Sequence, residues 1–190
     1  KAGPGISVKL SALHPRYEAL QRDRVLSELL PRVLSLALLA KSAGMGFNID
    51  AEEADRLDLS LDIIEALIAS PSLRDWNGLG VVVQAYGLRC APLIDWLAAT
   101  AKEHDRRIMV RLVKGAYWDS EIKKAQVDGL SGYPVFTRKA NTDLSYLACA
   151  RRMFAAHDAL YPMFATHNAQ TIAAIHQMAE GRDFEFQRLH

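Results

Sequence analysis

The chain has 190 residues, 50% of them hydrophobic, and carries 23 basic against 22 acidic side chains. This content suffices for one hydrophobic core, and the balance of charge excludes the strongly basic surface expected of a nucleic-acid-binding protein. The most apolar stretch, residues 25–40, contains Glu28 and Arg32, so no membrane span of about 20 residues is predicted.

The two cysteines indicate the kind of compartment in which the chain is found. Cys90 and Cys149 lie in predicted helices, far apart in the sequence, and match neither a zinc spacing nor a disulfide framework. We therefore expect buried thiols in a reducing compartment, provisionally the cytoplasm.

The opening Lys1-Ala2-Gly3-Pro4-Gly5 has no methionine and no signal peptide, so we expect an interior piece of a longer polypeptide.

The apolar pattern alternates between strand and helix periods along the whole chain. In chain order it predicts strand 6–11 and helix 17–41, strand 47–50 and helix 57–69, strand 79–86 and helix 91–104, strand 107–114 with helices 119–128 and 141–157, strand 163–166 and helix 170–180, and a last strand 184–189.

This order predicts an α/β fold, a parallel sheet with helices outside, either doubly wound or a (βα)8 TIM-type barrel. Two features favour the barrel: no strand leads into a G-x-G-x-x-G turn, and polar residues end nearly all the strands. A closed barrel needs eight units, so residues 1–190 would be a partial barrel of about six strands. We expect such a piece to lack its C-terminal units and to be unstable alone.

Single polar residues mark the ends of the first three strands, and each has two interpretations. Lys9 alternates with apolar neighbours, so it faces the barrel interior or is a surface lysine. Asp50 can orient an amine, bind a metal or hold a cofactor, or it is a turn acid. Gln84 places an amide in an apolar strand. This amide either pairs with a heterocycle or is a core residue whose hydrogen bonds are made within the protein.

Later segments carry more polar groups. Strand four and the residues after it contain two cations, small residues and two aromatics: Arg111, Val113, Lys114, Gly115, Ala116, Tyr117 and Trp118. This set suits an anionic, planar ligand such as a nucleotide cofactor. Alternatively, the two aromatic residues only cover the core. Thr137-Arg138-Lys139 lies just before a predicted helix, and it is interpreted either as a phosphate-binding site or as a basic turn exposed to solvent. Thr166-His167-Asn168 ends strand five with three hydrogen-bonding side chains.

Seven segments in this order resemble one family: VKLSALHPRY, NIDAEE, VVVQAY, VRLVKGAYWDSEIK, FTRK, YPMFATHN and EFQRLH. Together they are similar to the proline dehydrogenase domain of the bacterial bifunctional proline utilization A flavoproteins, from Gly3 to His190. The resemblance implies a distorted (βα)8 barrel that holds FAD noncovalently. It also implies oxidation of L-proline to Δ1-pyrroline-5-carboxylate, with electrons passed to a membrane quinone.

The same resemblance implies partners outside this chain. An aldehyde dehydrogenase domain of the parent chain would oxidise glutamate semialdehyde with NAD, and the parent would associate peripherally with the inner membrane. The family's arginine pair for the proline carboxylate would lie beyond His190, so we expect this piece alone to be inactive. No nucleic acid contact is expected from this segment.

By motif, the resemblance assigns roles to individual residues. Lys9 and Asp50 correspond to charged residues on the substrate side, Arg111 to the guanidinium near flavin N5, and Gln84 to the amide that bonds the isoalloxazine. The implied catalytic set is Lys9, Asp50 and Arg111, and no metal site is implied. The implied cofactor contacts are Asp50, Ala51, Gln84, Arg111, Val113, Lys114, Gly115, Ala116, Tyr117, Trp118, Thr137, Arg138, Lys139, Thr166, His167, Asn168, Gln187 and Leu189.

Three rival functions stay open from the residues alone. An aldolase-type barrel enzyme would form a Schiff base on Lys114. A metal-dependent hydrolase would use Asp50, Glu52 and His167, although no paired-histidine spacing appears. A scaffold module with a decayed site would bind no cofactor.

Overall fold

The computed structural model describes residues 3–189, so Lys1, Ala2 and His190 of the expected domain lie outside it. Its centre is a six-stranded parallel sheet in the sequential order β1-β2-β3-β4-β5-β6. The strands are β1 (Gly5–Val8), β2 (Gly46–Ile49), β3 (Leu79–Gln84), β4 (Ile108–Val113), β5 (Leu160–Ala165) and β6 (Glu185–Gln187).

All the predicted helices are present. They are α2 (Arg22–Ser42), α3 (Leu57–Ala69), α4 (Cys90–Glu103), α5 (Trp118–Val127), α6 (Lys139–Ala155) and α7 (Ala169–Ala179), together with the short α1 (Leu10–Leu13) and 3-10 turns at Ala19–Gln21, Ala54–Arg56 and Pro71–Leu73. Helix α3 has the bounds predicted from the sequence. Among residues 3–189, no helix is both long enough and apolar enough to cross a bilayer.

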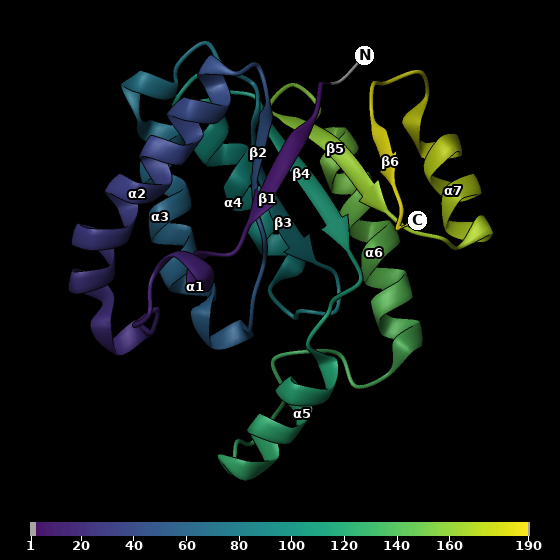
Figure 1. The fold of residues 1–190 in the computed structure, drawn as a ribbon. Coiled ribbons are helices and arrows are strands. Elements are labelled where there is room, and N and C mark those ends of the chain that lie inside the picture. Colours follow the sequence, from purple (N-terminus) through teal and green to yellow (C-terminus); the bar gives the residue numbers. More distant parts are fainter. Residues whose placement is uncertain (1–2, 190) are drawn as a thin grey trace.

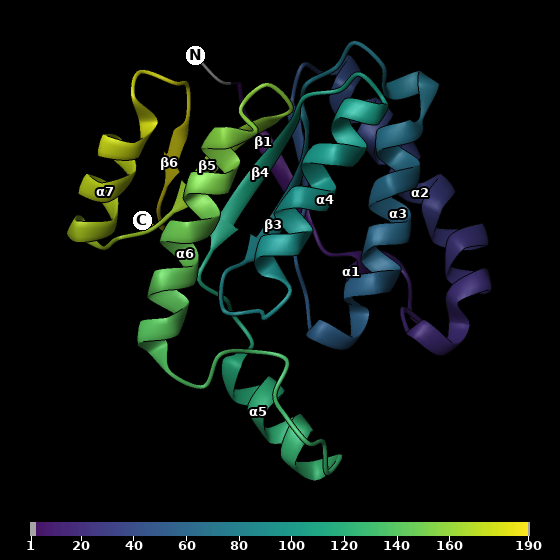
Figure 2. The same cartoon turned by 180° about the vertical axis from the view of Figure 1, so that it is seen from behind.

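The strand order decides between the two predicted architectures. A doubly wound sheet reverses its strand order and carries helices on both faces, whereas here each strand pairs with the next one in sequence. Right-handed crossovers in one direction keep every helix on the same side, and α4 and α6 lie behind the strands in Figure 1 and in front of them in Figure 2. The expectation of a partial TIM-type barrel is therefore confirmed as a half-barrel.

The first predicted strand is wrong beyond Val8. Lys9 is the N-cap of α1, and the Ala12 amide donates to the Lys9 carbonyl at 3.1 Å, closing a helical turn where an extended strand was predicted. The apolar residue at position 10 produced the error, because Leu10 is buried from a helix rather than from a strand. The following helix begins at Arg22 rather than at residue 17, and β5 begins earlier than predicted, at the fully buried Leu160.

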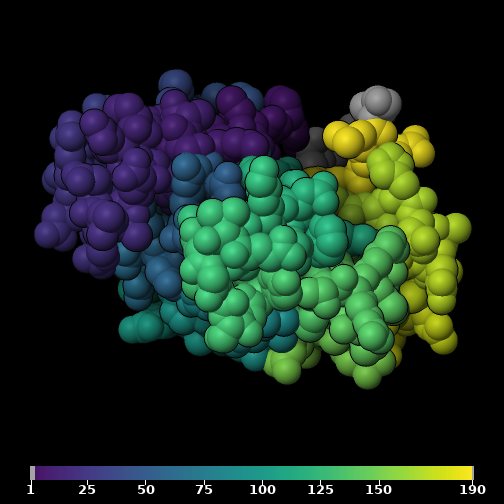
Figure 3. Space-filling view, turned by 90° about the horizontal axis from the view of Figure 1, so that it is seen from below, coloured from purple at the N-terminus to yellow at the C-terminus, as the bar shows by residue number. Residues whose placement is uncertain are grey.

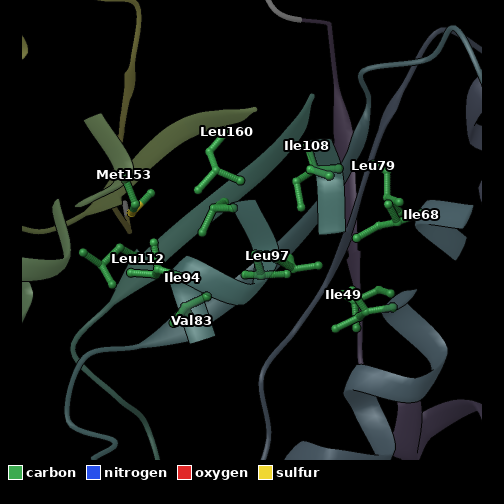
Figure 4. Packing of buried hydrophobic residues seen from close by; sticks show 14 of the residues in the cluster. Ile49, Ile68, Leu79, Val83, Ile94, Leu97, Ile108, Leu112, Met153 and Leu160 are labelled. Carbon is green, nitrogen blue, oxygen red and sulfur yellow. The ribbon is translucent and has the colours of Figure 1, made fainter. Parts of the chain in front are cut away.

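Alternate strand residues build the core between sheet and helices. Val83 of β3 and Leu112 of β4 point toward Ile94 and Leu97 of α4, and all four are buried (Figure 4). Burying a side chain of this size stabilises the fold by about 1.5–3 kcal/mol. Successive side chains of a strand point to opposite faces. The strand residues that alternate with these buried ones, such as Arg111, therefore point to the concave face of the half-barrel.

The strand register gathers the site residues on that concave face. Arg111 aligns with Val82 on one side and with Met163 on the other, and Gln84 aligns with Val113. The carboxyl ends of parallel strands meet at one rim, where barrel enzymes place their chemistry. Figure 3 looks onto this rim, with the α5 region lying across it.

Candidate functional site

An ion pair between Arg111 and Asp50 forms the centre of the site. One terminal nitrogen of the Arg111 guanidinium donates to the Asp50 carboxylate, and the other donates to Ser7 Oγ at 3.0 Å. Both charged side chains are partly exposed, so they remain accessible to a ligand. The cation is thus held by Ser7 of β1 and by the residue after β2. The sequence had not indicated Ser7.

Gln84, at the end of β3, joins the segments that follow the two strands on either side of it, β2 and β4. Its Nε2 donates to the Glu52 carbonyl at 3.0 Å, and its Oε1 accepts from the Ala116 amide at 3.0 Å. Both ends of the amide are therefore partnered within the protein, as the core-residue interpretation expected. The same bonds set the separation between the segment after β2, which includes Ala51, and the segment after β4.

This bridge gives a stability prediction. Gln84→Leu leaves a backbone carbonyl and an amide without their partners, so the free energy of unfolding should fall by about 1–2 kcal/mol. Urea unfolding followed by circular dichroism measures the change. The matched control is Gln126→Leu, because Gln126 is exposed and makes one long hydrogen bond of 3.4 Å. It should change stability by no more than about 0.5 kcal/mol; equal losses in both variants would contradict the bridge.

The segment after β4 makes a close backbone approach and contacts β1. Gly115 has φ 142°, and a Cβ atom there would lie 2.3 Å from the Tyr86 ring, so only glycine fits. Lys9 donates to Tyr117 Oη at 3.0 Å, and this hydrogen bond raises the pKa of the Lys9 ammonium. Lys9 is therefore an exposed cation at the rim, tied to the aromatic segment.

A second group of charges lies where α6 begins. Lys114 and Lys139 both pair with Asp143, the latter at 2.7 Å, and Lys114, followed by Lys139, lowers the pKa of that carboxyl. Arg138 is the exposed N-cap residue of α6, next to the exposed Thr137. Anions are stabilised by cations and amides at a helix N-terminus, so this end of the rim can hold a phosphate-bearing ligand.

Residues after β5 and β6 meet at the far edge. The Leu189 amide donates to His167 Nε2 at 3.3 Å, and the Thr166 amide donates to the Gln187 carbonyl at 3.2 Å. Asn168 caps α7, since its Oδ1 accepts from the Thr171 amide at 2.9 Å. The cap gives Asn168 a structural role, and its contact with a cofactor stays a prediction.

The donor set fits the two parts of a flavin dinucleotide. Cations and helix amides near Lys114, Arg138 and Lys139 suit an anionic part, while Trp118, 42% exposed and donating to the Phe136 carbonyl, offers a planar surface. Arg111 and Gln84 lie on the strands between these groups and β1. The residues that the sequence predicted for the cofactor lie within β4, at or just after the end of a strand, or at the start of α5 or α6.

Two of the rival functions find little support in this geometry. The Lys114 ammonium pairs with the Asp143 carboxylate, whereas a Schiff-base lysine needs a desolvated neutral amine. Glu52 accepts from the Ser11 amide at 3.0 Å and pairs with Arg56 at 3.1 Å, so both of its carboxylate oxygens have partners within the protein. Within residues 3–189, histidine, cysteine and acidic residues form no group of three that could hold a metal ion.

A cavity of about 660 Å³ lies beside this rim on the helix side of the sheet. Its wall comes from α3, α4, α5 and residues 130–135, and it reaches Asp50 and Gln84 at the strand ends. The carboxyl of Glu121 lines it, 4% exposed, and accepts from the Ala54 amide at 2.6 Å. We refer to this space as the α3–α4 cavity.

Burial of Glu121 gives a pH prediction. Desolvation raises the pKa of its carboxyl, so the folded state favours the protonated form. The stabilisation is complete below the unfolded pKa of about 4.3 and is lost as the pH rises through the folded value. Glu121→Gln keeps the acceptor for Ala54 without the charge, so its stability relative to the original chain should rise between pH 4 and neutral pH.

Urea midpoints across this pH range measure the Glu121 effect. The matched control is Glu65→Gln, because Glu65 is exposed on α3. Its difference from the original chain should change little with pH, whereas the Glu121→Gln difference should grow. A Glu121→Gln difference that stays flat would show that the carboxyl is not buried in its charged form.

Comparisons with known proteins place this chain. Residues 1–190 match the profile of the proline dehydrogenase family. The chain is 59% identical to the bifunctional protein PutA of Escherichia coli over 99% of its length, which is 14% of that protein, and 61% identical to that of Rhizobium meliloti, covering 15% of it. A solved structure of proline utilization A with proline bound in remote sites superposes with a TM-score of 0.96 at 61% identity, over 98% of this chain and 19% of that one.

Proposed function

The chain belongs to the proline dehydrogenase family, and we propose that it forms the FAD-binding part of a bifunctional enzyme that oxidises L-proline to Δ1-pyrroline-5-carboxylate. It spans about one seventh of the length of its curated relatives, so the activity belongs to the longer protein. The observation that carries the proposal is the Arg111–Asp50 ion pair on the concave face, with Gln84 and Lys9 at the same rim.

The roles of the residues follow from their charge and position. FAD, when bound, would supply the redox chemistry as a hydride acceptor, and the residues of the rim would hold and orient it and the proline. Arg111 holds a positive charge where negative charge develops, and Asp50 and Ser7 keep that guanidinium from turning away. Lys9 attracts the substrate carboxylate, and the proline amine loses its proton before or during the transfer.

The remaining residues bind rather than react. Lys114, Arg138 and Lys139 neutralise the pyrophosphate, and Trp118 and Tyr117 cover the planar parts of the cofactor. Gly115 lets this segment pass against the Tyr86 ring, where a side chain would collide.

The longer protein supplies what these residues lack. We propose that a membrane quinone takes the electrons, that an aldehyde dehydrogenase domain of the same chain uses the product, and that the parent is a cytoplasmic protein associated peripherally with the inner membrane. The sheet described here is open between β1 and β6, so the substrate site is unenclosed on that side. The 190-residue chain alone should therefore be inactive.

A turnover assay with the full-length protein tests the proposal. The protein should reduce an artificial electron-accepting dye only when L-proline is added, and heat should release FAD that chromatography identifies. Borohydride added with a carbonyl substrate should leave Lys114 unmodified. A Lys114 adduct in a protein without flavin would replace this proposal with the aldolase-type enzyme.

A further inference from the structure

Two thiols that the proposed reaction does not use face each other between helices. Cys90 is the first residue of α4 and Cys149 lies in α6, and their sulfur atoms are 3.3 Å apart although the residues are 59 positions apart in sequence. Both are free cysteines and both are buried. The sequence had predicted two buried thiols, but it had not brought them together.

The distance between the sulfurs is close to what a covalent bond needs. A disulfide has a sulfur–sulfur distance of about 2.05 Å, so the two atoms must approach by only roughly 1.2 Å from the 3.3 Å observed. Helices α4 and α6 already pack against each other.

The α3–α4 cavity reaches this pair. Cys90 is part of its wall, beside Leu93 and Leu97, whereas Cys149 lies behind Cys90 and is fully buried. A small neutral molecule is favoured at this apolar part of the wall, because a charged one loses its hydration there.

We propose that Cys90 and Cys149 form a modification site, a dithiol that a small hydroperoxide entering through the α3–α4 cavity oxidises to an intrachain disulfide. The hydrogen bond between the two sulfurs is the main cause that lowers the pKa of Cys149, and the Ser145 hydroxyl adds to it, whereas the same contact raises the pKa of Cys90, so Cys149 is the thiol of the pair that gives up its proton more readily.

The reaction balances with one molecule of hydrogen peroxide as the oxidant. The Cys90 sulfur, which lines the cavity, attacks a peroxide oxygen as it passes its proton to the Cys149 thiolate, so that an S–O bond forms, the O–O bond breaks and hydroxide leaves to become water. The Cys149 sulfur then attacks the Cys90 sulfenic acid, so that the S–S bond forms and the S–O bond breaks, releasing a second water. Two thiols lose two electrons and two protons, and the peroxide is reduced to two water molecules.

Peptide mapping of the full-length protein tests this site. The folded protein is treated with hydrogen peroxide, its remaining thiols are blocked with N-ethylmaleimide in denaturant, and trypsin then yields residues 90–102 and 140–151 as separate peptides. We expect these two peptides to be joined after treatment, at least tenfold more than before it, and to separate on reduction. Both peptides recovered with N-ethylmaleimide at every peroxide concentration would overturn the proposal.

Two variants examine the pairing and the route. In Cys149→Ala the joined peptide should be absent, and a Cys90 that instead joins another cysteine equally well would overturn the specific pairing. Leu93→Trp narrows the cavity beside Cys90 without touching Cys149, so linking should slow several-fold; an unchanged rate would overturn the route. Because the original protein gives the first result by itself, the test stands even where a variant fails to fold.

Discussion

Replacing Arg111 with methionine should lower kcat/KM for L-proline by about 100- to 1,000-fold in the full-length protein, the cost typical of losing one charged group that stabilises a transition state. Methionine approximates the length of arginine but carries no charge and donates no hydrogen bond. Asp50 and Ser7 also lose the group that both of them contact. Steady-state kinetics, together with the flavin content of the purified variant, measure the effect.

Ser7→Ala is the matched control for Arg111→Met. It removes only the 3.0 Å hydrogen bond to the guanidinium and leaves the Asp50 ion pair in place. We expect it to lower kcat/KM by no more than about tenfold, since one hydrogen bond contributes about 0.5–1.5 kcal/mol. Unchanged turnover and unchanged FAD content in Arg111→Met would contradict the central role of this cation.

Gly115→Ala should destabilise the protein by roughly 3 kcal/mol or more, because it combines backbone strain with a collision. The φ of 142° is unfavourable for any residue with a Cβ, and that atom would lie 2.3 Å from the Tyr86 ring. Tyr86 is buried and two hydrogen bonds fix its backbone, so the ring has little room to move. The Tyr86 amide donates to the Lys114 carbonyl at 2.8 Å, and its carbonyl accepts from the Phe136 amide at 2.7 Å.

Gly129→Ala separates the two contributions. Gly129 also has a positive φ, 64°, but no atom lies within 4 Å of where its Cβ would be. This control carries strain without a collision and should lose about 1–2 kcal/mol. Chemical unfolding of both variants, with their flavin content, makes the comparison. If Gly115→Ala were no less stable than Gly129→Ala, the close approach to Tyr86 would not exist.

Much of the fold follows from local patterns in the sequence. The bounds of α3 and the valine-rich strand β3 follow directly from hydrophobic periodicity. The end of β1 does not, because Val8 and Leu10 are spaced as in a strand although Leu10 belongs to a helical turn. A single apolar residue satisfies both periods, and only packing in three dimensions decides between them.

The candidate site was likewise predictable from the sequence only in part. Asp50 and Arg111 were expected at one rim, since strand ends in a parallel sheet converge there. Ser7 was missed because it contacts Arg111 from a distant strand, and that depends on register across the whole sheet. The cap made by Asn168 had a local signal, an asparagine at the start of a helix.

The packing of helices against one another is the feature that the sequence predicts least. The contact between Cys90 and Cys149 depends on how α4 and α6 cross, and no local pattern encodes that. Burial of Glu121 likewise depends on the way α5 faces the segment after β2, where the Ala54 amide donates to its carboxyl. Both features arise from contacts between elements that the sequence alone cannot orient.

An anaerobic absorbance spectrum of the full-length protein, recorded before and after addition of L-proline, tests the proposed function most directly. Flavin bands at about 380 and 450 nm should be present, and the longer-wavelength band should bleach when proline is added. A protein that stays colourless after incubation with FAD, or whose flavin bands do not change with proline, would contradict a proline-oxidising flavoenzyme.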